Sequence, residues 1–335
     1  MIDYACALLI AKDIFPKIIL TTSVVLNISV LMYFKYSNFV IGMINDLFRS
    51  DIQLLSIILP MGISFYTFKG ISYLSDVYRK QVEAERNINR FSAYIIMFPQ
   101  IMSGPIDSYG RYSDSLKEDL VTLDWLYEGA KRMVLGLSQK VIIANTLGII
   151  VDDIWSKGAG SISWQLAWLC SISYSLQIYF DFAGYSNMAI GIGKMLGYEF
   201  SENFNLPYMS KSITEFWRRW HMSLGEWFKK YVYIPLGGNR KSKIGGYINL
   251  LVVFLLTGIW HGAAWTFIIW GLLNGILRIL EKGLHEKVIQ ISISRRIKDF
   301  IAHVYLILVA NFAWVLFRAP DIKQAFIFLN PCLEK

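Results

Sequence analysis

Two histidines stand among tryptophans and small residues, where either could act as a general base. His221 lies in the segment SITEFWRRWHMSLGEWFKKY, and His261 lies in TGIWHGAAW, near the middle of an uncharged run over residues 244–277. A neutral imidazole can take a proton from a hydroxyl group. An ionisable side chain at membrane depth is costly unless a partner or a water-filled cavity compensates, which makes it a candidate functional residue. For each histidine, the alternative interpretation is a packed side chain that one neighbour satisfies.

Other kinds of chemistry have weaker support in the sequence. No HExxH motif and no set of His, Asp and Glu ligands accompanies either histidine, so no metal site is expected. The nucleophile motif GxSxG is missing, which leaves a serine triad unsupported. The letters GIGK lack the full spacing of a phosphate loop, so we reject nucleotide binding. Three distant cysteines show no CxxC spacing and predict neither a disulfide framework nor a zinc site.

The composition is that of a membrane protein. Hydrophobic residues make up 55% of the chain and charged residues 17%, against about 25% charged residues in ordinary soluble domains. The net charge of +8 comes from Lys and Arg gathered at the ends of apolar runs, which favours anchoring on the cytoplasmic side over nucleic-acid binding. Runs that approach the roughly 20 residues needed to cross a bilayer as a helix are 18–34, 52–68, 158–180, 244–277 and 300–317.

The two histidines are predicted to lie on different elements. The run 244–277 is too long for one span but suits two helices joined by a tight turn. Because basic residues flank both of its ends, we expect a hairpin with His261 near the apex, directed away from the cytoplasm. Residues 212–231 predict one amphipathic helix at the membrane interface, with His221 at the edge of its apolar face. That apolar face comprises Phe216, Trp217, Trp220, Leu224, Trp227 and Phe228.

Three upstream segments are expected to support this arrangement. Residues 52–68 contain Pro60 and Gly62 and predict a kinked span. The segment 69–90 gathers five basic residues, including Lys69, and is assigned to the cytoplasmic side. Prolines and a glycine interrupt residues 91–106, so a broken or re-entrant element is as compatible with them as a full span. Residues 129–151 predict a helix partly at the interface.

Asp181 is the only charged residue between positions 158 and 193, and it has two interpretations. It either ends a helix in a turn of small residues or forms a functional polar network with Tyr185 and Asn187. Nearby, residues 193–197 and, further on, residues 271–275 match the small-xxx-small pattern of helices that pack closely in membranes.

Long stretches of the chain resemble the membrane-bound O-acyltransferase family. The resemblance rests on FWRRWHMSL and the WHG of TGIWHGAAW, together with GISFYTFKGISYLSDVYRK and MFPQIMSGPI upstream. It is strongest to the bacterial alginate O-acetylase branch, which is similar to the teichoic-acid D-alanyl transfer proteins, and it covers nearly all of residues 18–320. Family members usually carry further spanning helices on both sides. We therefore expect residues 1–335 to be a single membrane-embedded domain that is incomplete at both termini.

The resemblance implies an all-α, polytopic membrane enzyme with about eight spanning or re-entrant helices, the interfacial helix and a tunnel between the two membrane faces. By position, His261 matches the family's catalytic histidine, and His221 matches its second histidine. Tryptophans and backbone dipoles are expected to orient the thioester and the developing oxyanion. The residues we expect to contact substrate are Trp260, Trp217, Arg218, Asp181 and Tyr185.

The resemblance also implies partners and a location. An acyl thioester, acetyl-CoA in the simplest case, is the expected donor on the cytoplasmic side, with no bound cofactor. The acyl group would pass towards hydroxyls of an exported polysaccharide such as alginate, through an extracytoplasmic acyl-accepting or transferase protein. The chain would lie in the plasma membrane and cross it several times.

Three alternatives stay open at this point. One is transfer of D-alanyl or another acyl group to a cell-wall polymer. A second is a transporter or channel in which Asp181 and the histidines relay protons, although the sequence has no inverted repeat. The third is a subunit without catalytic activity that only docks a partner.

Overall fold

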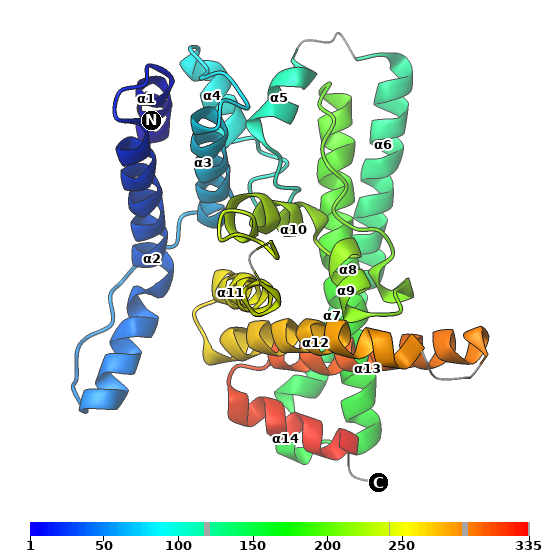
Figure 1. The fold of residues 1–335 in the computed structure, drawn as a ribbon. Coiled ribbons are helices and arrows are strands. Elements are labelled where there is room, and N and C mark those ends of the chain that lie inside the picture. The colour runs from blue at the N-terminus through cyan, green and yellow to red at the C-terminus, as the bar shows by residue number, and fades with distance from the viewer. Residues whose placement is uncertain (117–120, 241, 290–293, 334–335) are drawn as a thin grey trace. The chain divides into compact units, whose positions relative to one another are not determined.

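The chain folds into helices joined by short loops (Figure 1). The computed structural model describes residues 1–116, 121–240, 242–289 and 294–333, and these ranges contain no strand apart from an isolated bridge between Phe204 and Trp220. The chain divides into two compact units, one of Met1–Val134 with Ser186–Ser201 and one of Leu135–Tyr185 with Glu202–Lys335. The predicted all-α membrane architecture is confirmed.

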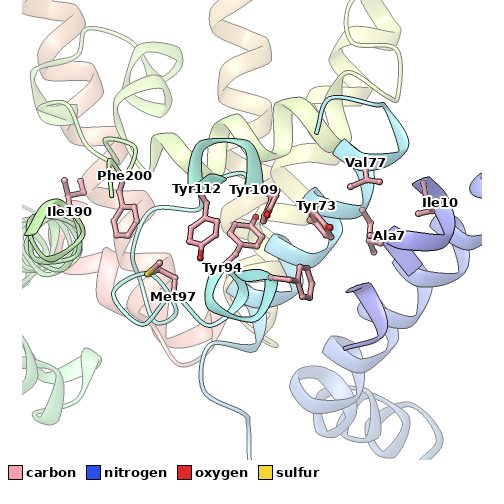
Figure 2. Packing of buried hydrophobic residues seen from close by; sticks show 12 residues of the cluster. Ala7, Ile10, Tyr73, Val77, Tyr94, Met97, Tyr109, Tyr112, Ile190 and Phe200 are labelled. Carbon is pink, nitrogen blue, oxygen red and sulfur yellow. The ribbon is translucent and has the colours of Figure 1, made fainter. Parts of the chain in front are cut away.

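The first unit holds the N-terminal helices. They are α1 (Ile2–Ala11), α2 (Pro16–Phe48), α3 (Ile63–Tyr78), α4 (Ile88–Ile95) and α5 (Tyr109–Ser115), with the start of α6 (Leu123–Ser138) and the end of α8 (Trp164–Met195). Asn87 begins α4 because its side chain accepts hydrogen bonds from the backbone of Asn89 and Arg90. Figure 2 shows tyrosine rings gathered in the core where α3, α4 and α5 meet.

The second unit holds the C-terminal helices. They are η1 (Gln139–Ala144), α7 (Asn145–Ser156), η2 (Ala159–Ser161), η3 (Pro207–Met209), α9 (Ile213–Arg219), α10 (Met222–Phe228), η4 (Lys229–Tyr233), α11 (Lys243–His261), α12 (Trp265–Ile289), α13 (Arg295–Arg318) and α14 (Ile322–Leu333). Serine side chains cap α9, α11 and α13 by accepting a backbone N–H of the first turn. Figure 1 shows α12 and α13 side by side.

Four helical stretches in the described ranges are long and apolar enough to cross a membrane: Pro16–Phe48, Leu123–Ser156, Lys243–His261 and Arg295–Arg318. The predicted runs 18–34 and 300–317 fall within α2 and α13, so both helices are confirmed. The predicted kinked span over 52–68 is wrong. Residues 51–60 form no helix, and α3 begins only after Gly62, whose φ of +72° lies in the left-handed region that favours glycine.

The predicted hairpin over 244–277 is confirmed as α11 and α12, which a turn at residues 262–264 joins. Glycines allow the two helices to touch. A Cβ atom at Gly258 would lie 2.3 Å from the carbonyl oxygen of Phe267, and a Cβ atom at Gly271 would lie 2.4 Å from that of Phe254. The small-xxx-small pattern at 271–275 therefore marks a real helix contact. At 193–197 the neighbour of the first glycine is instead the ring of Phe200.

The predicted single helix over 212–231 is wrong, because α9 and α10 are separate. Trp220 is extended and pairs with Phe204, and His221 takes a left-handed φ of +45°. Phe216, Trp220 and Leu224, from the expected apolar face, are buried. Periodicity alone could not reveal the break, since the pairing partner lies 16 residues upstream.

Two further predictions about charged residues are corrected. Asp181 does not end a helix, because α8 continues through it to Met195. Lys69 is not part of a basic surface: its side chain is 1% exposed, and its Nζ donates hydrogen bonds to the carbonyl of Tyr94 and to Oε1 of Gln100. A buried lysine needs such oxygen partners, and those come from a segment 25 to 31 residues away.

Candidate active site

Both histidines line one cavity in the second unit. The cavity has a volume of about 1520 Å³, and its walls come from α9, α10, α11, α12 and α13. Binding pockets for small molecules commonly occupy about 300 to 1,000 Å³, so this space is large enough for a long substrate. His221, His261, Trp217 and Arg218 are among the residues that line it.

His261 is the last residue of α11 and stands in an aromatic enclosure. Its ring is 5.2 Å from that of Trp270 and 4.9 Å from that of Phe317, both in edge-to-face arrangements. The chain leaves the helix at Gly262, which is extended, and a Cβ atom there would lie 2.2 Å from the ring of Phe267. The WHG sequence thus places a half-buried imidazole on the cavity wall among aromatic rings.

His221 is held in a polar pocket that the sequence analysis did not foresee. Its Nδ1 lies 2.9 Å from Oδ1 of Asn203, and both residues are almost fully buried. The backbone N–H and the hydroxyl of Ser223 donate to the same Oδ1 at 3.4 and 3.0 Å. Because a backbone N–H can only donate, the atom of Asn203 that faces His221 is the oxygen, and Nδ1 of His221 must carry the proton. Its Nε2 is then the basic nitrogen.

The surroundings of His221 keep its imidazole neutral. Burial, and to a lesser extent the neighbouring His261, hold the pKa of His221 well below its usual range. Nε2 of His221 is buried and has no hydrogen-bond partner among the described residues. The Trp260 ring lies 6.0 Å from His221 and 4.8 Å from His261, so one tryptophan contacts both imidazoles.

The structure separates the expected substrate contacts into two groups. Trp217 and Arg218 line the cavity, and Nε1 of Trp217 donates to Oδ1 of Asn274 at 3.1 Å. Asp181 and Tyr185 are not among the lining residues. Asp181 instead pairs with Lys140, while Asn187 accepts hydrogen bonds from Arg132. The expected network of Asp181, Tyr185 and Asn187 thus has different partners.

Asn203 and Arg278 are residues that sequence reasoning missed. Asn203 lies in SENFNLPY, within the residues 18–320 that the resemblance covers, but nothing local ties it to a histidine 18 positions later. Arg278 served only as a flank of the hairpin, whereas it lines the cavity. For Arg278 the available signal was a charged residue between apolar neighbours, in GILRIL.

Comparisons with known proteins place this site in a family. The model of MBOAT, the membrane-bound O-acyltransferase family, matches residues 86–322, which include both histidines. The chain is 42% identical over 310 residues to a probable alginate O-acetylase AlgI of Azotobacter vinelandii, covering 91% of this chain and 61% of the relative. It is 34% identical over 338 residues to a peptidoglycan O-acetyltransferase of Helicobacter pylori, covering 93% and 64%.

A third relative extends the range of transferred groups. It is a teichoic acid D-alanyltransferase of Bacillus subtilis, 33% identical over 232 residues, which cover 65% of this chain and 57% of the relative. The chain therefore spans about 60% of the length of the curated relatives it matches. The matched family region, the apolar helices and the paired histidines lead to one conclusion: the chain belongs to the membrane-bound O-acyltransferase family.

Proposed function

We propose that the chain transfers an acyl group, acetyl in the simplest case, from a thioester to hydroxyl groups of an exported polysaccharide. The observation that carries this proposal is the cavity of about 1520 Å³ with His261 and His221 on its wall. Two relatives are named as O-acetylating enzymes, of alginate and of peptidoglycan, which supports an acetyl group and a carbohydrate acceptor.

His261 is the general base of the proposed reaction. It takes the proton of the acceptor hydroxyl, the oxygen attacks the thioester carbonyl, and the tetrahedral intermediate expels the thiolate, which takes the proton back from the imidazolium. His261 suits this role because its ring is half-buried on the cavity wall, whereas the His221 side chain is 2% exposed. His221 acts as a positioning residue, and its neutrality leaves His261 free to accept a positive charge.

The surroundings assist in two ways. The rings of Trp270 and Phe317 pack edge to face against His261 and fix the orientation of its imidazole on the cavity wall. Trp217 lies on the cavity wall, where its ring can orient the donor, and Arg218 supplies a positive charge there. Trp260 is not among the lining residues; it contacts both imidazoles and remains a proposed substrate contact. Asp181 and Tyr185 remain proposed substrate contacts, and Asp181 would have to exchange Lys140 for substrate.

The proposal also covers the identity of the donor and the route of the acyl group to the acceptor. Acetyl-CoA is the proposed donor on the cytoplasmic side, and the acyl group reaches the polymer through an extracytoplasmic acyl-accepting or transferase partner. The D-alanyltransferase among the relatives favours a second candidate, transfer of D-alanyl to a cell-wall polymer. Competition between acetyl and D-alanyl thioesters in one preparation separates the two candidates.

The test replaces His261 with alanine in membranes that contain the full chain and a labelled acetyl donor. General bases contribute about 10² to 10⁴ in rate, so acylation by His261→Ala should fall at least about 100-fold with folded protein still inserted. His303→Ala is the matched control, because His303 lies on α13 with Nδ1 3.0 Å from the Ser210 carbonyl and does not line the cavity. Retained acylation by His261→Ala would overturn the assignment. Solute flux without acyl transfer by the unaltered chain would favour the transporter alternative.

A further inference from the structure

One part of the cavity is lined by cations, and of these the proposed chemistry uses only Arg218. Among the lining residues, six are basic and four are acidic. The basic side chains are Lys211, Arg218, Lys229, Arg278, Lys282 and Lys298. An excess of positive charge inside a concave site favours an anionic ligand.

Three of the four carboxylates on the cavity wall are already bound to other groups of the protein. Both oxygens of Glu281 accept backbone N–H groups at the start of α9, from Ile213 at 2.5 Å and from Thr214 at 2.9 Å. These oxygens therefore supply acceptors for the unpaired N–H groups at the start of α9. Glu281 itself lies one turn after Arg278 on α12. The other two engaged carboxylates are Asp299, paired with Lys211 at 2.8 Å, and Glu215, paired with Arg219 at 2.7 Å.

Arg278 is a donor that is left partly unused. Its guanidinium carbon lies 5.4 Å from the ring centre of Phe254, and its Nε is buried with no hydrogen-bond partner in the described part of the chain. Arg218 is close enough for its charge to repel that of Arg278, and Glu281 offsets only part of the unfavourable effect of burial and repulsion on Arg278. Arginine stays protonated in proteins, so neither side chain can relieve the repulsion by losing a proton. An anion between them would relieve it and supply acceptors in the forked geometry that arginine prefers.

The distance from His261 to this arginine pair can be estimated along both helices of the hairpin. Trp270 contacts the His261 ring, and Arg278 lies eight residues further along α12, which is about 12 Å of helix. On α11, Phe254 lies under Arg278 and seven residues before His261, which is about 10 Å. Both helices therefore give the same separation of about 10 to 12 Å.

That separation lies within the reach of one chemical group of biological thioester donors. In a phosphopantetheine arm, about thirteen bonds join the phosphorus to the sulfur, which corresponds to roughly 15 Å at the length per bond of an extended peptide chain. A thioester carbonyl held at His261 would thus bring the phosphate of the same arm to Arg278. A free inorganic anion would gain nothing from this spacing.

We propose that Arg218 and Arg278 bind the phosphate of the donor's phosphopantetheine arm, which rests on the proposed acyl transfer. The arm is common to CoA and to acyl carrier proteins, so the pair recognises what the two donors share. The pair fixes the donor's depth in the cavity, because the phosphate stays at the arginines while the acyl group reaches the imidazole.

The first test compares donors with and without the phosphate. For the full chain in proteoliposomes, kcat/KM is measured with acetyl-CoA, an acetylated acyl carrier protein and acetyl-pantetheine. For Arg278→Gln and for Arg218→Gln, the preference for either phosphate-bearing donor over acetyl-pantetheine should fall by about 10- to 100-fold, the range expected for charge-assisted hydrogen bonds. Arg240→Gln, an exposed arginine away from the cavity lining, is the matched control and should keep the preference.

A binding measurement separates this proposal from the proposed function. Purified chain is titrated with 4′-phosphopantetheine and with pantetheine. Tighter binding of the phosphorylated compound that Arg278→Gln abolishes and Arg278→Lys partly keeps supports the phosphate site, even if the chain transfers no acetyl group. If both arginine variants keep their thermal stability and still prefer the phosphorylated compound as the unaltered chain does, the phosphate site is overturned. The two arginines would then bind another anion, such as a lipid phosphate.

Discussion

The hydrogen bond between Asn203 and His221 can be tested with a substitution that replaces the amide nitrogen of Asn203 by an oxygen and so adds a negative charge. Asn203→Asp keeps an acceptor next to Nδ1 of His221 but places a buried carboxylate about where Oδ1 now lies, 2.9 Å away. An opposite charge at that distance favours the imidazolium and raises a histidine pKa by about one to three units. The burial of the new carboxylate opposes part of this shift.

The sign of the effect on activity follows from the role of His221. In the unaltered chain its pKa is well below the usual range, so the imidazole is neutral at physiological pH. In Asn203→Asp the raised pKa means that His221 gains a proton at a higher pH than in the unaltered chain. The two histidines interact, so a charged His221 opposes the proton that His261 must accept during catalysis. Acylation by the variant should therefore be lost at a higher pH than in the unaltered chain.

The assay is the pH profile of kcat between pH 5 and pH 8 in proteoliposomes. Asn205→Asp makes the same chemical change on an exposed side chain two residues along the same loop and is the matched control. An acid limb that does not move in Asn203→Asp, or that moves equally in the control, would refute the link between the two residues. Asn203→Leu removes the acceptor from three buried donors and should cost about 1 to 3 kcal/mol of stability for each donor left unsatisfied.

Two further predictions concern the scaffold. Gly258→Val should lower the free energy of unfolding of the purified chain by at least about 1 to 3 kcal/mol, because its Cβ atom would overlap the Phe267 carbonyl. The control is Gly283→Ala, at a helix position with nothing within 4 Å, which should be neutral or stabilising by up to about 1 kcal/mol. Equal losses of stability in the two variants would contradict the close contact of α11 and α12. Asp181→Lys should reduce folded yield, and Lys140→Asp combined with it should restore the yield, because the ion pair is rebuilt with its charges exchanged. Restored yield without acylation would support the substrate contact proposed for Asp181, and restored acylation would contradict it.

Sequence alone predicted features that depend on a short stretch of chain. Hydropathy located α2 and α13, and the length of the run 244–277 with its basic flanks predicted two helices and a turn. Hydropathy was wrong for residues 52–68, because residues 51–60 are mostly apolar but form no helix and α3 begins only after Gly62. An apolar run indicates that its side chains avoid water, but it does not determine the backbone conformation. Pro60 also lacks the backbone N–H that a helix there would need as a hydrogen-bond donor.

The candidate site was predictable in its residue types but not in its contacts. The sequence singled out His221 and His261 and placed them on separate elements, as the structure does. It could not predict that Asn203 would set the protonated nitrogen of His221, because that contact depends on how two loops pair in space. Arg278 escaped notice for a similar reason, since a basic flank and a cavity residue look alike in sequence.

The break at His221 connects these failures to function. A left-handed φ of +45° is uncommon for a residue other than glycine and costs about 1 kcal/mol or more. It persists because the bridge from Phe204 to Trp220 and the hydrogen bond from the Met222 N–H to the Asn203 carbonyl hold the chain on both sides. A continuous helix would have avoided this cost, but it would not have brought the His221 ring against Asn203. Strain that the surroundings maintain is typical of functional positions, and here it falls on the histidine that the motif had already marked.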